Sequence, residues 1–234
     1  MHQLAAQLAD DFLPGHWERV STSAFSRVSV NRALMLYHKE YRRKSPLQIL
    51  EDLYRGSRAT RARHNAEALL LAGIDAPATV GGGKLPGGRE YLFTSAAPGE
   101  GVDHWLRRVP GAGAAETLRQ RRQLLCALGT FIGRVHATGF IHGDLRPDNI
   151  IAALQGEQFH FTLLNNERNT RKSPTPGRLL LRNLTQLNQL PPAVLSRTDR
   201  MRFFSSWRRQ MRDLSTIEAN VLAREAYQLA MRQL

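Results

Sequence analysis

The sequence has 234 residues, 42% of them hydrophobic, and its 33 Lys and Arg residues against 20 Asp and Glu residues give a formal net charge of +13. This length suits one large domain or two small lobes that share a cleft, and the hydrophobic content is enough for a sizeable core. The single cysteine, Cys126, excludes an intramolecular disulfide and favours a reducing compartment, and its place on a helical pattern predicts a buried thiol.

The excess of positive charge predicts an anionic partner, which could be nucleic acid, an anionic membrane surface or a phosphorylated glycan. No basic segment has the interleaved aromatic residues that stack bases, so we expect no nucleic-acid partner. No apolar run approaches the ~20 residues of a transmembrane segment, and residues 1–14 lack the basic start of a secretory signal. We therefore expect a cytoplasmic protein that is peripheral on a membrane.

The first part of the chain predicts a short helix and then three strands. These elements are expected at residues 3–9, 17–23, 26–30 and 33–41. The segment 21–26, where a loop could cover phosphates, contains small residues but no G-x-G-x-x-G. Lys39 on the third strand is our candidate for the lysine that pairs with the α- and β-phosphates of a nucleotide. The alternative is a lysine that is only solvated.

Two helices are predicted next. Residues 45–48 begin one helix, with Ser at the N-cap and Pro at the first helical position, and a second is expected from 58 to 72. Glu67 on the second helix is the predicted ion-pair partner of Lys39, and the alternative is an exposed glutamate. The arginines in the first half of that helix fit either a solvated face or contact with anionic lipid or substrate.

Glycine and proline mark a boundary near the middle of the chain. We expect a strand at 78–80, a glycine-rich hairpin at 81–88, a returning strand at 89–94 and a hinge at 96–101. This predicts an N-lobe at 1–95 that binds the nucleotide phosphates. It also predicts a C-lobe at 102–234 that holds the catalytic loop, the metal segment and the substrate side.

The most informative stretch, 141–150, follows an amphipathic helix predicted at 115–138. It reads H-G-D-L-x-x-x-N, the spacing of the catalytic loop of kinases. Phosphoryl transfer needs a carboxylate aimed at the nucleophile and an oxygen ligand for magnesium. Asp144 would take the hydroxyl proton, His142 would belong to the same catalytic group, and Asn149 would bind the metal. The alternative is a polar turn with only local hydrogen bonds.

A strand predicted at 159–164 leads to the position where kinases carry a metal-binding aspartate. Here that residue is Asn165, whose neutral amide binds magnesium less well than a carboxylate does. Glu167, two residues on, is an alternative acidic ligand, but its side chain would point to the opposite face if the segment were extended. Helices are then expected at 178–190, 197–214 and 215–234. The second combines arginines with aromatic residues, which fits either an anionic interface or aromatic side chains in the core with arginines outside.

Several segments, taken in this order, resemble the bacterial lipopolysaccharide kinase family, which includes the core heptose kinases and the Kdo kinases. They are Tyr37-His38-Lys39, the Arg-rich helix into Glu67, His142-Gly143-Asp144-Leu145 with Asn149, and the segments 163–168, 182–188 and 198–204. The resemblance extends from about residue 17 to about residue 210.

This resemblance implies an α+β, two-lobed protein-kinase-like fold, with a small antiparallel-sheet N-lobe and a mainly helical C-lobe. It implies ATP-dependent phosphorylation of a heptose or Kdo hydroxyl of the lipopolysaccharide inner core, with Mg²⁺ as a cofactor. The partners would be lipopolysaccharide core or its lipid A-core precursor, on the cytoplasmic face of the inner membrane of Gram-negative bacteria. Asp144 would be the base, Asn149 a metal ligand, and Lys39 the phosphate clamp partnered by Glu67. The acidic metal ligand of the family maps to Asn165.

Two alternatives stay open. Because Asn165 replaces an acidic residue, the chain could be a pseudokinase that binds nucleotide or glycan without transfer. A small-molecule phosphotransferase of the aminoglycoside or choline kinase type also uses an H-G-D-L loop, although the many arginines argue against it.

Overall fold

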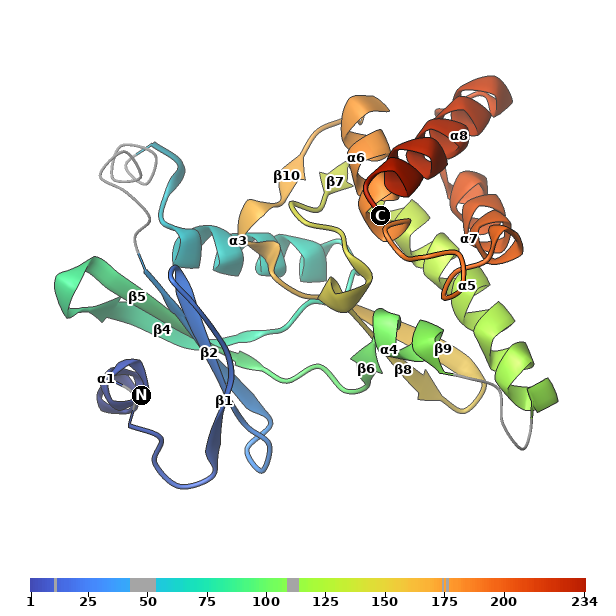
Figure 1. Cartoon of the computed structure of the whole chain (residues 1–234). Coiled ribbons are helices and arrows are strands. Elements are labelled where there is room, and N and C mark those ends of the chain that lie inside the picture. The colour runs from blue at the N-terminus through green and yellow to red at the C-terminus, as the bar shows by residue number, and fades with distance from the viewer. Residues whose placement is uncertain (11, 43–53, 109–113, 174, 176) are drawn as a thin grey trace. The chain divides into compact units, whose positions relative to one another are not determined.

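The computed structural model describes residues 1–10, 12–42, 54–108, 114–173, 175 and 177–234 (Figure 1). They form two compact units, which we name the sheet unit (residues 1–97 and 166–168) and the helical unit (residues 98–165 and 169–234). The helix start predicted at 45–48 lies outside the described residues.

The sheet unit is built on an antiparallel sheet. Its strands lie in the order β1 (Trp17–Ser23), β2 (Ser26–Asn31), β3 (Leu36–Tyr41), β5 (Arg89–Ser95) and β4 (Thr79–Leu85). β3 begins at Leu36, three residues later than predicted, because Met35 has a positive φ of 51° in the turn before it. Of the glycines expected in a hairpin, residues 81–83 belong to β4, and residues 87 and 88 lie in the 3₁₀ turn η1 (Pro86–Gly88) between β4 and β5. A Cβ on Gly82 would lie 3.0 Å from the backbone oxygen of Tyr91, so glycine suits this close approach of two strands.

Helices α1 (His2–Ala9) and α3 (Arg58–Leu71) cover opposite faces of this sheet (Figure 1). α1 packs into a cluster with Trp17 and Phe93, whereas α3 packs against Tyr41 and Leu92. Successive strand residues point to opposite faces, so neighbouring side chains such as 92 and 93 enter different clusters. The two faces of β3 therefore have different surroundings.

The helical unit contains two small sheets and most of the helices. β6 (Glu100–Gly101), β8 (Ile150–Gln155) and β9 (Gln158–Leu163) form one sheet, and β7 (Phe140–Ile141) pairs with β10 (Thr170–Arg171). The helices are α4 (Val102–Arg107), α5 (Ala114–Ala137), α6 (Gly177–Leu187), α7 (Arg197–Gln210) and α8 (Thr216–Arg232). None of the helices in the described ranges is both long and apolar enough to cross a membrane.

Helices α5 and α7 approach each other closely. A Cβ on Gly133 of α5 would lie 2.8 Å from the carbonyl oxygen of Trp207, so glycine permits this contact. Phe203, Phe204 and Trp207 of α7 are buried, so these aromatic side chains belong to the core, but Arg200 of the same helix is buried as well. Cys126 on α5 is exposed, so the expectation of a buried thiol was wrong.

The α+β class predicted from the sequence is confirmed. The antiparallel sheet belongs to the N-terminal part of the chain, and the C-terminal part is mainly helical.

Candidate active site

The H-G-D-L-x-x-x-N segment lies in the helical unit between β7 and β8. Gly139, with a φ of 83°, ends α5 and turns the chain into β7. Pro147 then begins a short 3₁₀ turn, η2 (Pro147–Asn149), which leads directly into β8. The loop is therefore anchored at both ends by paired strands.

Asp144 and Asn149 are joined by hydrogen bonds within this loop. Asn149 Nδ2 donates to the backbone oxygen of Asp144 at 2.8 Å and to its Oδ2 at 3.2 Å. Arg146 Nε also donates to Asp144 Oδ2, at 3.2 Å. The Asp144 side chain remains 37% exposed, so its carboxylate is oriented by donors and can still be reached from solvent.

His142 is buried beneath this carboxylate. Its Nδ1 accepts the backbone N–H of Asp144 at 3.1 Å, and its Nε2 donates to the backbone oxygen of Leu164 at 2.7 Å. Only 1% of the residue is exposed, which leaves it no route to a substrate. His142 thus links the loop to the segment that follows β9, and its membership of the catalytic group stays a prediction.

Asn165 comes directly after this link and has a positive φ of 58°. Its Nδ2 donates to Asn149 Oδ1 at 2.6 Å. The oxygen that was predicted to bind a metal therefore accepts a hydrogen bond from the residue that replaces the acidic ligand. Asp144, Asn149 and Asn165 form one hydrogen-bonded chain that carries a single carboxylate.

Lys39 lies in a charged cluster of the sheet unit, together with Arg58 and Glu167. Lys39 Nζ is 3.2 Å from Glu167 Oε1 and 3.3 Å from Oε2, and Arg58 Nη2 is 3.2 Å from Oε1. The Lys39 ammonium also lies 5.1 Å from the centre of the Tyr41 ring, two residues along β3. Side chains 39 and 41 share one face of the strand, and α3 packs on this face.

The predicted ion pair between Lys39 and Glu67 was wrong. Glu67 is half-exposed and lies 3.8 Å from Arg63, one turn earlier on α3. Glu167 takes its place because residues 166–168 form a 3₁₀ turn within the sheet unit, where Asn65 Nδ2 also donates to the backbone oxygen of Asn166 at 2.7 Å. In the extended conformation that we considered for this segment, the Glu167 side chain would point away from this position.

The charges of the cluster fix its protonation. Burial alone would raise the pKa of Glu167, but Lys39 and Arg58 lower it below its ordinary value. Burial lowers the pKa of Lys39, and the Glu167 carboxylate opposes that shift. Arg168 adds a further positive charge near Lys39. Among the described residues, Lys39 and Arg58 both contact the Glu167 carboxylate, and Arg168 lies near Lys39, so positive charge gathers on this face of β3.

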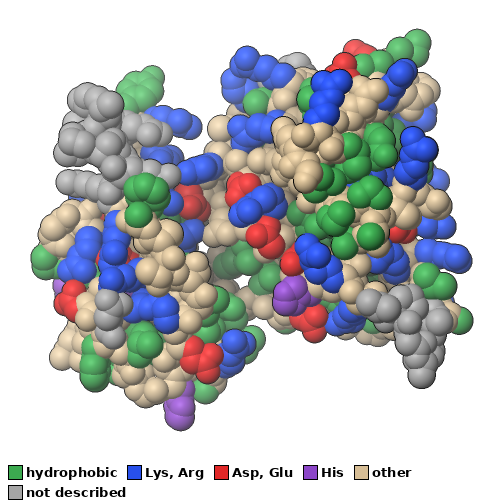
Figure 2. All heavy atoms as spheres, in the orientation of Figure 1, with side chains coloured by type: hydrophobic (Ala, Val, Ile, Leu, Met, Phe, Trp, Pro, Cys, Tyr) green, Lys and Arg blue, Asp and Glu red, His purple; other side chains and the backbone are tan. Residues whose placement is uncertain are grey.

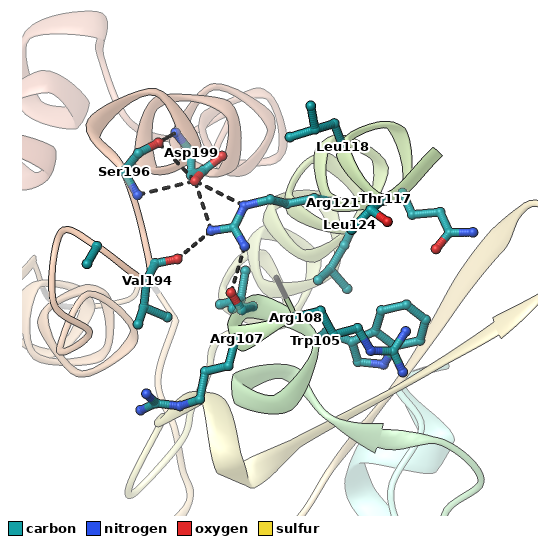
Figure 3. A pocket seen from close by; sticks show the side chains of 13 residues that line it. Trp105, Arg107, Arg108, Thr117, Leu118, Arg121, Leu124, Val194, Ser196 and Asp199 are labelled. Carbon is teal, nitrogen blue, oxygen red and sulfur yellow. Dashed lines mark hydrogen bonds and ion pairs between the residues drawn. The ribbon is translucent and has the colours of Figure 1, made fainter. Parts of the chain in front are cut away.

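A cavity of about 510 Å³ lies elsewhere in the helical unit, bordered by α4, the first half of α5 and the start of α7 (Figure 3). Arg121 donates to the backbone oxygen of Leu106 at 2.7 Å, to Asp199 Oδ2 at 3.0 Å and to the backbone oxygen of Val194. Ser196 also bonds Asp199, so the Asp199 carboxylate is held by groups of the cavity wall, and we assign this cavity no part in the predicted chemistry.

Sequence reasoning missed two sets of residues near these sites. Glu167 was considered only as a metal ligand, and its position after a buried strand was the only signal available. Polar side chains of α6, which bind the backbone of the loop, lie about 40 residues after it in the chain and gave no signal.

Comparison with known proteins links these sites to one family. The sequence model of the lipopolysaccharide kinase (Kdo/WaaP) family matches residues 18–207. Among curated proteins, the EKC/KEOPS complex subunit bud32 of Aspergillus clavatus is 38% identical over 53 residues. That match spans 21% of this chain and 19% of the relative, so it reaches only about a fifth of the relative's length.

Two solved structures are similar over nearly the whole chain. WaaP in complex with acyl carrier protein has a TM-score of 0.58 and 17% identity, and the match covers 96% of this chain and 92% of that one. An aminoglycoside-3'-phosphotransferase of type VIII has a TM-score of 0.61 and 14% identity, with 98% of each chain covered. At these identities the likeness shows the fold alone, and it confirms the predicted protein-kinase-like architecture.

Proposed function

The chain belongs to the lipopolysaccharide kinase (Kdo/WaaP) family, a family of phosphotransferases, and we propose that it transfers the γ-phosphate of ATP to a heptose or Kdo hydroxyl of the lipopolysaccharide inner core. The observation that carries this proposal is the geometry of the loop from 142 to 149. It combines an accessible, oriented carboxylate with a family match that includes the loop.

In this proposal Asp144 is the general base. Its Oδ2 is held by donors from Asn149 and Arg146, so the carboxylate is oriented before the sugar arrives. The hydroxyl proton passes to Asp144 while the oxygen attacks the γ-phosphorus, and ADP leaves. His142 holds the backbone N–H of the base and takes no part in the proton transfer.

Lys39 supplies the contact with the nucleotide phosphates. Arg58 and Arg168 add to its charge, and Glu167 holds its ammonium group in place. We assign residues 1–95 to the lobe that binds phosphates, 96–101 to the hinge and 102–234 to the lobe that carries the base.

Kinases in general use ATP with a divalent metal, and we tested whether the loop suits Mg²⁺. The only carboxylate in the hydrogen-bonded chain is Asp144, and Asn149 Oδ1 already accepts a hydrogen from Asn165. In the described part of the chain, no three His, Cys, Asp or Glu side chains gather to hold a metal. These residues do not fit a magnesium site made of protein carboxylates. We therefore derive no step from a metal held by this chain.

The same hydrogen bond favours a second candidate function, a pseudokinase that binds nucleotide or glycan without transfer. An aspartate at 165 would place a carboxylate oxygen beside Asn149 Oδ1, and two acceptor oxygens need a cation between them. Asn165 Nδ2 instead donates a hydrogen to Asn149 Oδ1, so the two side chains are joined without a metal. Choline- or aminoglycoside-type substrates have no such observation in their favour.

One experiment separates these functions. Purified deacylated lipopolysaccharide core is incubated with ATP and Mg²⁺, and transfer is followed as a mass gain of one phosphate. A gain with the wild type and none with Asp144→Ala supports the kinase. No gain with the wild type, with nucleotide still bound, supports the pseudokinase and overturns the kinase proposal. Soluble aminoglycosides and amino alcohols serve as the control acceptors.

We place the membrane-facing surface of the chain on α7 and α8. A mainly apolar groove of about 500 Å³ lies there, lined by Phe204 and Tyr227 and flanked by Arg197 and Arg224. Met201 lines the groove and is exposed, and Ile217 and Val221 are exposed on α8. Figure 2 shows hydrophobic side chains gathered on the helical unit beside Lys and Arg side chains. Apolar area with arginines at its edge suits an anionic bilayer.

Sedimentation with phosphatidylglycerol vesicles tests this surface. The double variant Arg197→Glu with Arg224→Glu should lose most vesicle binding, because it reverses the charge beside the groove. Arg122→Glu, an exposed change on α5, is the matched control and should lose much less. Equal losses in both variants would contradict the assignment to α7 and α8.

A further inference from the structure

The catalytic loop is held by side chains of α6. Asn183 Oδ1 accepts the backbone N–H of His142 at 3.1 Å, and its Nδ2 donates to the backbone oxygen of the same residue at 2.8 Å. One buried amide therefore satisfies both backbone groups of the residue two positions before Asp144. This contact fixes where the loop begins.

Two more residues of α6 bind the loop on either side of Asp144. Gln186 Oε1 accepts the backbone N–H of Leu145 at 3.0 Å, and Arg182 Nη2 donates to the backbone oxygen of Gly143 at 2.7 Å. Residues 182, 183 and 186 lie on one side of a helix, since positions three and four apart are neighbours. Asn183 Nδ2 also donates to Gln186 Oε1 at 3.2 Å, which joins the two amides.

Behind Asn183 the hydrogen bonds continue through the core. Trp207 Nε1 donates to His136 Nδ1 at 3.0 Å, and His136 Nε2 lies 3.2 Å from Asn183 Oδ1. An indole nitrogen can only donate, so His136 Nδ1 is the acceptor and Nε2 carries the hydrogen. That hydrogen points to Asn183 Oδ1 and sets which end of the amide faces the backbone N–H of His142.

This chain is costly to bury, and that cost needs a reason. Trp207, His136 and Asn183 are each 0% exposed, in a core that is otherwise largely apolar. A buried polar network stabilises a unique arrangement only when every member has its partners, and here each side-chain nitrogen and oxygen named above has one. It ends on the backbone of the loop, where a displacement of 1 Å could cost roughly 100-fold in rate.

We propose that Trp207, His136 and Asn183 form a positioning network that holds the catalytic loop, and with it the Asp144 carboxylate, in the geometry needed for transfer. These are positioning residues, because none of them touches the substrate. The effect on transfer rests on the proposed function, whereas the effect on the loop backbone does not.

The test compares four variants. Asn183→Ala removes the amide and leaves room for water. His136→Leu removes both ring nitrogens, whereas His136→Gln keeps one acceptor and one donor. Thr185→Val is the matched control, because Thr185 is buried on the same helix and its hydroxyl donates only within it, to Leu181. Hydrogen–deuterium exchange of residues 140–149 and the kinetics of transfer are measured for each.

We expect Asn183→Ala and His136→Leu to speed amide exchange in residues 140–149 and to lower kcat roughly 100-fold with an unchanged KM for ATP. His136→Gln should restore most of the slow amide exchange and most of the kcat, and Thr185→Val should resemble the wild type. The proposal is overturned if exchange in Asn183→Ala and His136→Leu matches that of Thr185→Val, or if His136→Gln is no better than His136→Leu. If the wild type transfers no phosphate, only the proposed function fails, and the exchange data still decide the network.

Discussion

His38 of the sheet unit and His136 of the helical unit are both fully buried, but their ring nitrogens have different surroundings. His38 on β3 and His136 on α5 are both 0% exposed, and burial lowers the pKa of each to about 4. His136 has a hydrogen-bond partner on both ring nitrogens. Neither ring nitrogen of His38 has one within the described residues, and the ring lies 5.0 Å from the ring of Phe93.

Burial sets the protonation state of both rings, but the partners decide what each ring does. A neutral imidazole with two partners has a defined tautomer and can orient the groups it binds. A buried imidazole without partners loses the hydration of its ring nitrogens on folding, which lowers stability, and it orients no neighbouring group. We infer that the helical unit uses its histidine to hold the loop, whereas the sheet unit uses the opposite face of β3, where Lys39 lies.

The largest expected effects on kinetics come from removing Asp144 in the helical unit and Lys39 in the sheet unit, and the two changes should affect different kinetic constants. Asp144→Ala in the helical unit should lower kcat by roughly 10²- to 10⁴-fold and leave nucleotide affinity unchanged, because it removes a general base. Lys39→Met in the sheet unit should weaken ATP binding, because it removes a phosphate contact. Initial-rate kinetics and nucleotide titrations measure both, and full activity of Asp144→Ala would sink the assignment of the base.

Acid should destabilise both units through these histidines. Above pH 6.5 the rings are neutral in the folded and unfolded states and contribute nothing. As the pH falls from 6.5 towards 4, the unfolded chain binds protons that the folded chain does not, so stability falls by about 3 kcal/mol for each histidine. Urea unfolding at pH 7 and pH 5 measures the first part of this loss, about 2 kcal/mol for each histidine. A free energy of unfolding that does not change over this interval would contradict the lowered pKa values.

His136→Leu should destabilise the protein by about 1–3 kcal/mol at pH 7, because it leaves Trp207 Nε1 and one acceptor of Asn183 without a buried partner. The same variant should also lose half of the fall in stability that the two histidines cause on acidification. Chemical unfolding at pH 7 and pH 5 gives the free energy of unfolding at each pH. An unchanged free energy at pH 7 would show that these hydrogen bonds carry no stability.

His38→Leu is the matched change and should have the smallest effect, with the opposite sign. It removes two unpaired nitrogens from a cluster of Tyr91 and Phe93, so we expect stability to rise by roughly 1 kcal/mol at pH 7. The same unfolding curves measure it. If it destabilises as much as His136→Leu does, the contrast between the two histidines is wrong.

The parts of the fold that were predicted correctly depend on local patterns. Strand patterns predicted β1, β2 and β5 to within a residue, and the 3.6-residue period predicted α5. The loop motif was found because all its residues lie within eight positions. β3 was predicted too long, because no pattern in the sequence showed the positive φ of Met35.

The missed parts depend on side chains that meet across long separations. Lys39 and Glu167 are 128 residues apart, and His136 and Trp207 are 71 apart. A search along the chain favours the nearer glutamate, Glu67, although it lies on the exposed side of α3. Which carboxylate meets a lysine is decided by tertiary packing, and no local period reports it.

The three residues from 166 to 168 also have a consequence for synthesis. They belong to the sheet unit although 68 residues of the helical unit, 98–165, precede them in the chain. When residues 1–97 have left the ribosome, Glu167 has therefore not yet been synthesised. The ion pairs of Lys39 and Arg58 with Glu167 can form only later. Domains usually fold in order from the N-terminus during translation. Here the first unit is completed only after half of the second has been made, and a fragment cut at residue 97 lacks Glu167.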